Sequence, residues 1–161
     1  MAGIVAALLI LVLGGAMAYI RLAPSDPAVW NLPSKAMSDP FWQPGQARDA
    51  VGPLAVNEVP QGAAALVGIP RADAAEVLRR LDAIAMASAR TRRLAYDEKS
   101  GLATWITRSA FFGFPDYTTA QVRQDGDAVV LHVFARQRFG SDDFGVNAAR
   151  LKDWIGRLGV E

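Results

Sequence analysis

The first twenty residues constrain the fold of this chain more than any other feature. From Ala2 to Ile20 every residue is apolar or small, and none is charged. A helix of this length, at about 1.5 Å per residue, spans roughly the 30 Å hydrocarbon core of a bilayer. Tyr19 would place an aromatic ring at the membrane interface. We therefore predict one transmembrane helix or signal anchor within residues 1–22, with residues 2–20 in contact with the membrane.

A cleaved signal peptide is the alternative for the same segment. The apolar stretch Ile4–Leu13 is followed by Ala16-Met17-Ala18, a small-x-small pattern that is typical of cleavage sites. No Lys or Arg precedes the apolar stretch, however, and the stretch continues through Ile20. We favour retention of the helix as an anchor.

Composition limits the remaining chain to a single domain and excludes several kinds of site. The 161 residues, less the anchor, suffice for one compact core. The 17 Lys and Arg residues balance 16 Asp and Glu residues, so no net charge attracts nucleic acid, and we expect none as a partner. The chain has no cysteine, which excludes disulfides, thiolate nucleophiles and Cys-based metal sites.

Residues 23–62 are predicted to be a proline-rich linker. Regular structure should be sparse there, because each proline fixes φ and removes a backbone donor. Trp30, Phe41 and Trp42 are unusual in a disordered tether, so we expect this linker to drape over the domain or the membrane surface. The seven prolines are Pro24, Pro27, Pro33, Pro40, Pro44, Pro53 and Pro60.

Residues 63–161 are predicted to form an α+β domain, an antiparallel sheet of four to five strands with two helices packed on one face. The predicted strands cover residues 64–69, 92–96, 102–111, 117–123 and 128–139. An amphipathic helix of about 17 residues begins at Arg71, with Glu76, Arg79, Arg80 and Asp82 largely off its apolar stripe. A final helix begins at Asp143 and carries its apolar stripe on Phe144, Ala148, Leu151, Ile155 and Leu158.

The last predicted strand shows the clearest alternation. One face carries Val129, Leu131, Val133 and Ala135, and the other carries Val130, His132, Phe134, Arg136 and Arg138. Asp125-Gly126 before it suits a tight hairpin. One face should therefore lie in the core, while the other is mixed.

Polar side chains gather near the predicted start of the last helix. Arginines there could hold a carboxylate or phosphate, because guanidinium groups and free backbone N–H groups both favour anions. The same residues could instead form a salt-bridged latch between sheet and helix, with aspartates as caps. We favour the latch, because acidic side chains already occupy the positive helix end. The candidate ligand-binding residues are Arg108, Arg136, Arg138, Asp142, Asn147 and Arg150.

An aromatic turn separates two of the predicted strands. The simpler interpretation is that alternate rings fill the core, while Gly113 and Pro115 shape the corner. The sharper one is an apolar lip that touches lipid or gates a hydrophobic cavity. We favour the core, because alternation alone turns some rings inward. The four candidate lip residues are Phe111, Phe112, Phe114 and Tyr117.

No set of residues suitable for catalysis stands out. His132 lies within a strand without a second histidine or glutamate at metal-ligand spacing, so we expect a structural role and no metal site. The sequence contains neither a G-x-S-x-G elbow nor a Walker or dinucleotide glycine pattern. We expect no cofactor, and the catalytic residues, if there are any, are unknown.

Two motifs carry a resemblance to a known family. One spans Thr107–Asp116, and the other spans Arg136–Asn147 and is followed by Arg150. Together they resemble the domain-of-unknown-function family 1499 of bacteria and plants, over about residues 65–159. The segment Tyr19–Trp30 also resembles the stretch after the membrane anchor in some bacterial members. The resemblance implies no established activity, cofactor or catalytic residue.

These observations predict a binding or interaction domain at a membrane. The ligand would be a lipid-like or anionic small molecule between sheet and last helix, or a partner protein in the membrane. The alternatives are an enzyme that acts on a membrane-associated substrate through Arg108, Arg136, Asp142 and Asn147, and an accessory subunit of a membrane complex.

The side of the membrane is less constrained than the anchor itself. Arg21 and Lys35 follow the helix and favour a cytoplasmic domain. The likeness of the segment to an export signal favours the opposite side. We predict a single-pass protein of the bacterial inner membrane and favour the periplasmic side for its soluble domain.

Overall fold

Among the residues that the structure describes, two helices precede a six-stranded sheet, and two further helices cover it. The computed structural model describes residues 1–33, 56–59 and 61–159. In chain order the elements are α1 (Ala2–Leu22), α2 (Pro27–Trp30), β1 (Val56–Val59), β2 (Gly62–Pro70), α4 (Ala74–Met86), β3 (Thr91–Asp97), β4 (Leu102–Arg108), β5 (Pro115–Asp125), β6 (Ala128–Gln137) and α5 (Val146–Leu158).

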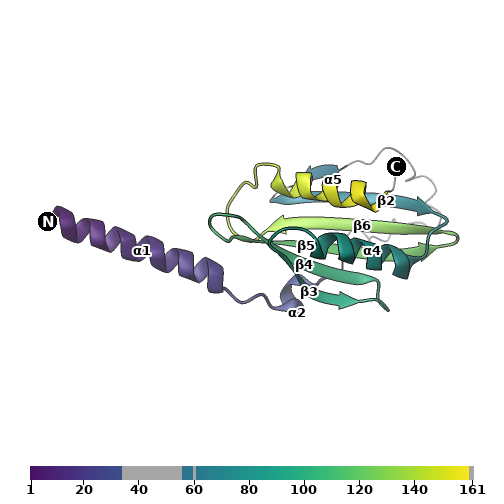
Figure 1. Ribbon diagram of the computed structural model, residues 1–161, viewed down its shortest axis with the longest axis horizontal. Helices are drawn as coiled ribbons and strands as arrows, with labels where there is room; N and C mark the ends of the chain where they lie inside the picture. The colour runs from purple at the N-terminus through teal and green to yellow at the C-terminus, as the bar shows by residue number, and fades with distance from the viewer. Residues whose placement is uncertain (34–55, 60, 160–161) are drawn as a thin grey trace.

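The sheet has the order β1-β2-β6-β5-β4-β3, and all neighbouring strands are antiparallel. Both α4 and α5 lie on one face of it (Figure 1). α4 contacts β3, β4, β5 and β6, whereas α5 contacts β1, β2 and β6. The predicted α+β architecture is therefore confirmed, except that the sheet has six strands instead of four or five.

The additional strand, β1, lies inside the segment predicted as a linker. Val56–Val59 pairs with β2, which begins at Gly62. A Cβ atom at Gly62 would collide with the Ala135 carbonyl oxygen, so β2 approaches β6 this closely only with glycine there. A four-residue strand near prolines carries little periodic pattern, which is why the sequence did not reveal it. Phe41 and Trp42 lie outside the described residues.

The alternation predicted for β6 is confirmed. Val129, Leu131, Val133 and Ala135 are fully buried in the cluster that includes the apolar faces of α4 and α5. Residues with the opposite parity point to the face opposite α4 and α5. The hairpin between β5 and β6 turns at Gly126, whose φ of 64° suits glycine.

α4 is shorter than predicted, because it begins at Ala74 instead of Arg71. The Asp73 carboxylate accepts a hydrogen bond from the Glu76 N–H at 2.9 Å and caps the helix. The predicted apolar stripe comprises Val77, Leu78, Leu81, Ile84 and Ala85. All of these residues are buried except Ile84, which is partly buried.

Asp82 of α4 was expected off the apolar stripe, yet it is only 9% exposed. Its carboxylate accepts hydrogen bonds from Trp105 Nε1, at 2.9 Å, and from Arg93. Trp105 in turn meets Trp154 of α5 edge-on, with ring centroids 5.6 Å apart. The buried carboxylate is thus fully partnered and joins α4 to two strands.

β4 ends at Arg108 instead of continuing to Phe111 as predicted. The chain leaves the sheet in a turn in which the Gly113 N–H donates to the Ser109 carbonyl oxygen at 3.2 Å. The Ser109 hydroxyl accepts from the Phe114 N–H at 3.0 Å. Gly113 has a φ of 72°, which glycine adopts at no steric cost.

β6 ends at Gln137, two residues before the predicted end, and α5 begins at Val146 instead of Asp143. Phe144 and Gly145 have φ values of 52° and 74°, which no right-handed helix allows. Phe144 therefore leaves the predicted helical stripe and is 88% exposed. The rest of the stripe is buried as predicted and comprises Ala148, Leu151, Ile155 and Leu158.

α1 projects away from one end of the domain (Figure 1). It has a mean hydropathy of 2.4, and none of it is buried inside the protein. Among the described residues it is the one helix whose length and composition suit a membrane span. A signal sequence would have the same properties, so α1 is an apolar helix consistent with an anchor.

Candidate functional site

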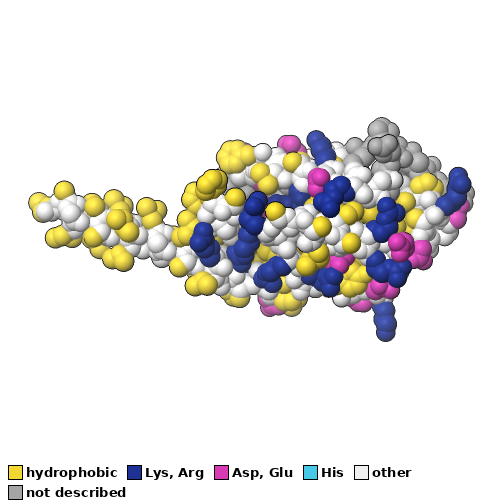
Figure 2. Space-filling model, in the orientation of Figure 1, with side chains coloured by type: hydrophobic (Ala, Val, Ile, Leu, Met, Phe, Trp, Pro, Cys, Tyr) yellow, Lys and Arg dark blue, Asp and Glu magenta, His cyan; other side chains and the backbone are white. Residues whose placement is uncertain are grey.

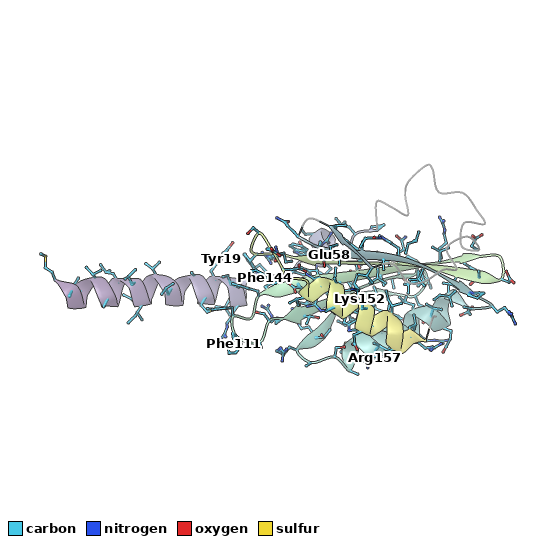
Figure 3. The ribbon with its side chains drawn as sticks, turned by 90° about the horizontal axis from the view of Figure 1, so that it is seen from above. Tyr19, Glu58, Phe111, Phe144, Lys152 and Arg157 are labelled. Atoms are coloured by element: carbon cyan, nitrogen blue, oxygen red, sulfur yellow. The ribbon has the colours of Figure 1, made fainter. Side chains whose placement is uncertain are left out.

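A groove of about 470 Å³ lies between the turn that follows β4 and the loop that joins β6 to α5. Its walls are mostly apolar and include Phe112, Phe114, Phe139, Phe144 and Val146, while Asp116 and Gln137 contribute polar groups. Phe111 and Phe144, which flank it, lie at the end of the domain from which α1 projects (Figure 3). We call this feature the apolar groove.

The turn on one side of the apolar groove is held in place by two arginines. Arg108 Nη1 donates to the Gly113 carbonyl oxygen at 2.8 Å. Arg21, at the end of α1, donates from Nη2 to the Phe111 carbonyl oxygen at 2.8 Å and from Nε to that of Phe112 at 3.3 Å. The C-terminal end of α1 is therefore attached directly to the aromatic turn.

The four predicted lip residues do not share one environment. Phe111 and Phe112 are 85% and 52% exposed, whereas Phe114 is half-buried against Phe112, with ring centroids 5.4 Å apart. Tyr117 is fully buried on the face of the sheet opposite α4 and α5. The two phenylalanines next to α1 thus fit the lip interpretation, and Tyr117 fits the core interpretation.

Hydrophobic side chains gather at the end of the domain next to α1 (Figure 2). Besides the aromatic turn, Phe144 is 88% exposed and Val146 is 52% exposed. Phe144 lies near Tyr19 and Phe111 in Figure 3, whereas Lys152 and Arg157 lie farther along α5. The domain therefore has one apolar end, which we call the phenylalanine end and define by Phe111, Phe112 and Phe144.

Asp116 and Gln137 are paired in register on β5 and β6, and they line the apolar groove together with the polar residues Ser109, Ser141, Asp142 and Asp143. Asp116 forms an ion pair with Arg150 Nη2 at 3.0 Å, and the two side chains are only 15% and 11% exposed. Burial raises the pKa of the Asp116 carboxyl group, and the Arg150 charge opposes that shift. Gln137 Nε2 is buried without a hydrogen-bond partner among the described residues.

Arg150 also connects the start of α5 to this pair. Its Nη1 atom donates to the Asn147 side-chain oxygen, while Asn147 is fully buried. Asp143 accepts hydrogen bonds from the N–H groups of Gly145 and Asn147, and Asp142 accepts from that of Phe144. The ion pair between Arg150 and Asp116 joins helix and sheet, whereas the predicted latch used arginines on the strands, so the latch as a whole stays a prediction.

Arg136 and Arg138 instead hold the segment that follows α1. Arg136 Nη2 donates to the Trp30 carbonyl oxygen at 2.7 Å, and Arg138 Nη1 donates to that of Pro24 at 2.8 Å. The Trp30 ring stacks on Tyr117, with centroids 3.8 Å apart and planes 7° apart. The predicted drape of Trp30 over the domain is present, on the face opposite α4 and α5.

The six predicted polar residues therefore divide into three groups by their hydrogen bonds. Arg108 holds the aromatic turn, Arg136 and Arg138 hold residues 24–30, and Asp142, Asn147 and Arg150 organise the start of α5. A catalytic use of Arg108, Arg136, Asp142 and Asn147 as one group stays a prediction.

His132 lies on the face opposite α4 and α5 and is 7% exposed. Burial lowers the pKa of its imidazole below the ordinary value. Within the part of the chain that the structure describes, no three His, Asp or Glu side chains are placed to hold a metal ion.

Sequence reasoning did not select Asp116, Gln137 or Phe139 as site residues. Asp116 stood within the first family motif, and the other two stood within the second. Their proximity depends on the register of β5 with β6, and a single sequence does not define that register. The sequence offered one signal for this site: aromatic and polar residues occur together near the ends of two strands that follow one another in the chain.

A search of curated proteins found no match. Among solved structures, a crystal structure of a DUF4468 family protein from Bacteroides ovatus is similar, with 14% sequence identity and a TM-score of 0.29. The alignment covers 73% of this chain and 88% of that one. A likeness at this level carries no argument about fold or function.

A family model described as "Protein of unknown function (DUF1499)" matches residues 23–158. The match confirms the resemblance that the two motifs indicated. It also extends to the segment that Arg136 and Arg138 hold and to β1. The chain belongs to the DUF1499 family.

Proposed function

We propose that this protein is a membrane-anchored binding domain whose apolar groove holds a lipid-like molecule. The observation that carries the proposal is a mostly apolar groove of about 470 Å³ at the end of the domain to which α1 is attached. Its volume lies within the range of small-molecule sites, roughly 300–1,000 Å³. Retention of α1 as the anchor is part of the proposal, and the side of the membrane stays a prediction.

The lining favours a ligand with an apolar chain and one hydrogen-bond acceptor. Aromatic walls from Phe112, Phe114 and Phe139 suit a hydrocarbon chain, since each buried methylene contributes about 0.8 kcal/mol. Gln137 Nε2 is a donor without a partner among the described residues, but it is buried, so an ester or carboxyl oxygen would satisfy it only if the Gln137 side chain turned towards the apolar groove. A single hydrogen bond contributes about 1 kcal/mol, so the apolar contact dominates the affinity.

Asp116 and Arg150 define what the polar part of the apolar groove would reject. Their charges compensate each other at 3.0 Å, and both side chains are mostly buried. Asp142 and Asp143 also line the apolar groove, so an anionic ligand would meet two further carboxylates, whereas a neutral ester would not be repelled. The support is therefore stronger for an uncharged lipid-like ligand than for the anionic one that the sequence also suggested.

Native mass spectrometry of the full-length protein, extracted in mild detergent, tests this proposal. We expect a co-purifying mass of lipid size on the wild-type protein. Val146→Trp places a bulky ring in the lining of the apolar groove and should remove that mass. Lys152→Trp, at an exposed position of the same helix, is the matched control and should retain it. An empty wild-type protein, or equal retention by both variants, would contradict the proposal.

A further inference from the structure

We infer that the phenylalanine end is inserted into the interface of the same bilayer that holds α1, so that the apolar groove opens towards lipid. This inference rests on the proposed function, because it takes α1 as a retained membrane anchor. It adds a membrane-contacting surface of defined residues, Phe111, Phe112 and Phe144, and the route by which a ligand reaches the apolar groove.

α1 brings the aromatic turn close to the membrane surface. α1 has 21 residues, and at about 1.5 Å per residue its length matches the hydrocarbon thickness, so Leu22 lies at the membrane surface when the helix spans it. Arg21 is bonded to the carbonyl groups of Phe111 and Phe112. No spacer separates the anchor from the aromatic turn, which therefore lies at the level of the lipid headgroups.

Exposed aromatic rings from separate parts of the chain meet at the phenylalanine end. Phe111 and Phe144 come from loops 33 residues apart, yet both rings are more than four-fifths exposed at the same end of the domain. Tyr19 of α1 is also exposed and meets Phe139, in the wall of the apolar groove, edge-on at 6.2 Å. Aromatic rings concentrate where protein crosses the membrane interface. The bilayer that already surrounds α1 is the occupant that this position specifies.

The backbone at Phe144 is strained. Its φ of 52° is unfavourable for an aromatic residue, by about 1–2 kcal/mol, and an 88% exposed ring recovers little of this within the domain. The N–H groups of Phe144 and Gly145 donate hydrogen bonds to the carboxylates of Asp142 and Asp143, and these bonds hold the strained loop. Insertion into lipid gives the exposed ring a contact that would offset this strain.

The distribution of charge agrees with this orientation. Lys and Arg side chains gather directly behind the hydrophobic end of the domain in Figure 2. With the phenylalanine end in the interface, those cations lie at the depth of the lipid phosphates, which attract them. The exposed parts of α5 at Lys152 and Arg157 then point away from the bilayer (Figure 3).

Single-cysteine labelling tests the insertion, because the natural chain contains no cysteine. Full-length Phe111→Cys, Phe144→Cys and Lys152→Cys each receive an environment-sensitive fluorophore and are reconstituted into phosphatidylcholine vesicles. We expect blue-shifted emission at positions 111 and 144, and severalfold stronger quenching by nitroxide-labelled lipid than at position 152. Near-UV circular dichroism confirms that each labelled protein is folded.

Emission at position 111 or 144 that matches emission at position 152 would overturn the inference. This result is also the one expected if a protein partner, and not the bilayer, covers this surface in the cell. The two proposals fail separately. Inserted fluorophores on a protein without co-purifying lipid would contradict the proposed ligand but support the insertion. A loaded groove with water-exposed fluorophores would do the opposite.

Discussion

Phe144 combines two features that a soluble domain has little reason to keep. Its ring is 88% exposed, and its backbone has a φ of 52°. Each feature alone is tolerable, but together they mean that neither packing nor backbone preference accounts for phenylalanine at this position. The proposed contact with the bilayer would account for it.

Replacing Phe144 by asparagine should therefore stabilise the folded domain. Asparagine tolerates positive φ, so Phe144→Asn is expected to raise the free energy of unfolding by about 1 kcal/mol. Phe111→Asn is the matched control, because Phe111 is equally exposed but does not have a positive φ. Thermal unfolding in the same detergent measures both variants. A loss of stability in Phe144→Asn relative to Phe111→Asn would show that the ring packs against the domain.

Single residues were predictable from the sequence where their environment follows from local periodicity. Val129 and Leu131 alternate with His132 as expected, because strand geometry alone decides the face. The partners of Arg136 and Arg138 were not predictable, since Trp30 and Pro24 are more than 100 residues away in the chain. The burial of Asp82 was not predictable either, because it depends on contacts of this helical residue with Trp105 and Arg93 from two strands.

Residues 23–33 behave as part of the domain instead of as a tether. The Trp30 ring stacks on the Tyr117 ring, and the guanidinium group of Arg136 is 5.0 Å from the Trp30 ring centroid. Asn31 accepts a hydrogen bond from the Thr104 hydroxyl at 2.8 Å. This short segment thereby fixes the distance between α1 and the sheet.

Removal of the Trp30 ring should loosen this attachment and destabilise the domain. The stacking on Tyr117 contributes about 1 kcal/mol and the cation–π contact of Arg136 about 0.5–1 kcal/mol, so Trp30→Ala should cost about 2 kcal/mol. Val29→Ala, in the same short helix at a position that is 54% exposed, should change stability by no more than about 0.5 kcal/mol. Chemical denaturation compares the two variants, and equal effects would mean that the segment does not belong to the folded unit.

Long elements with a clear period were predictable, and short or strained ones were not. β6 and α4 were recognisable because each presents several apolar residues at a fixed interval. β1 has only four residues, and β4 ends at Arg108 because hydrogen bonds of Ser109 form the turn. The apolar groove was beyond reach, because two separate loops form it and their proximity follows from the sheet register.

The molecule as a whole places its apolar groove, its exposed phenylalanines and its anchor at one end. The attachment of Arg21 to the aromatic turn links α1 to one wall of the apolar groove. The stacking of Trp30 on Tyr117 links the segment that follows α1 to the face of the sheet opposite α4 and α5. In the proposed arrangement the domain rests on the bilayer with its open groove downwards, and a lipid chain enters without crossing water.

Photocrosslinking from the bilayer tests this arrangement most directly. The full-length protein is reconstituted with phosphatidylcholine that carries a diazirine in the acyl chain, and the adducts are mapped by peptide mass spectrometry. We predict adducts on α1 and on the groove residues Phe112 and Phe139, with none around Lys152 and Arg157. Val146→Trp should remove the adduct on Phe139 and retain those on α1. Adducts confined to α1 in the wild-type protein would contradict the account.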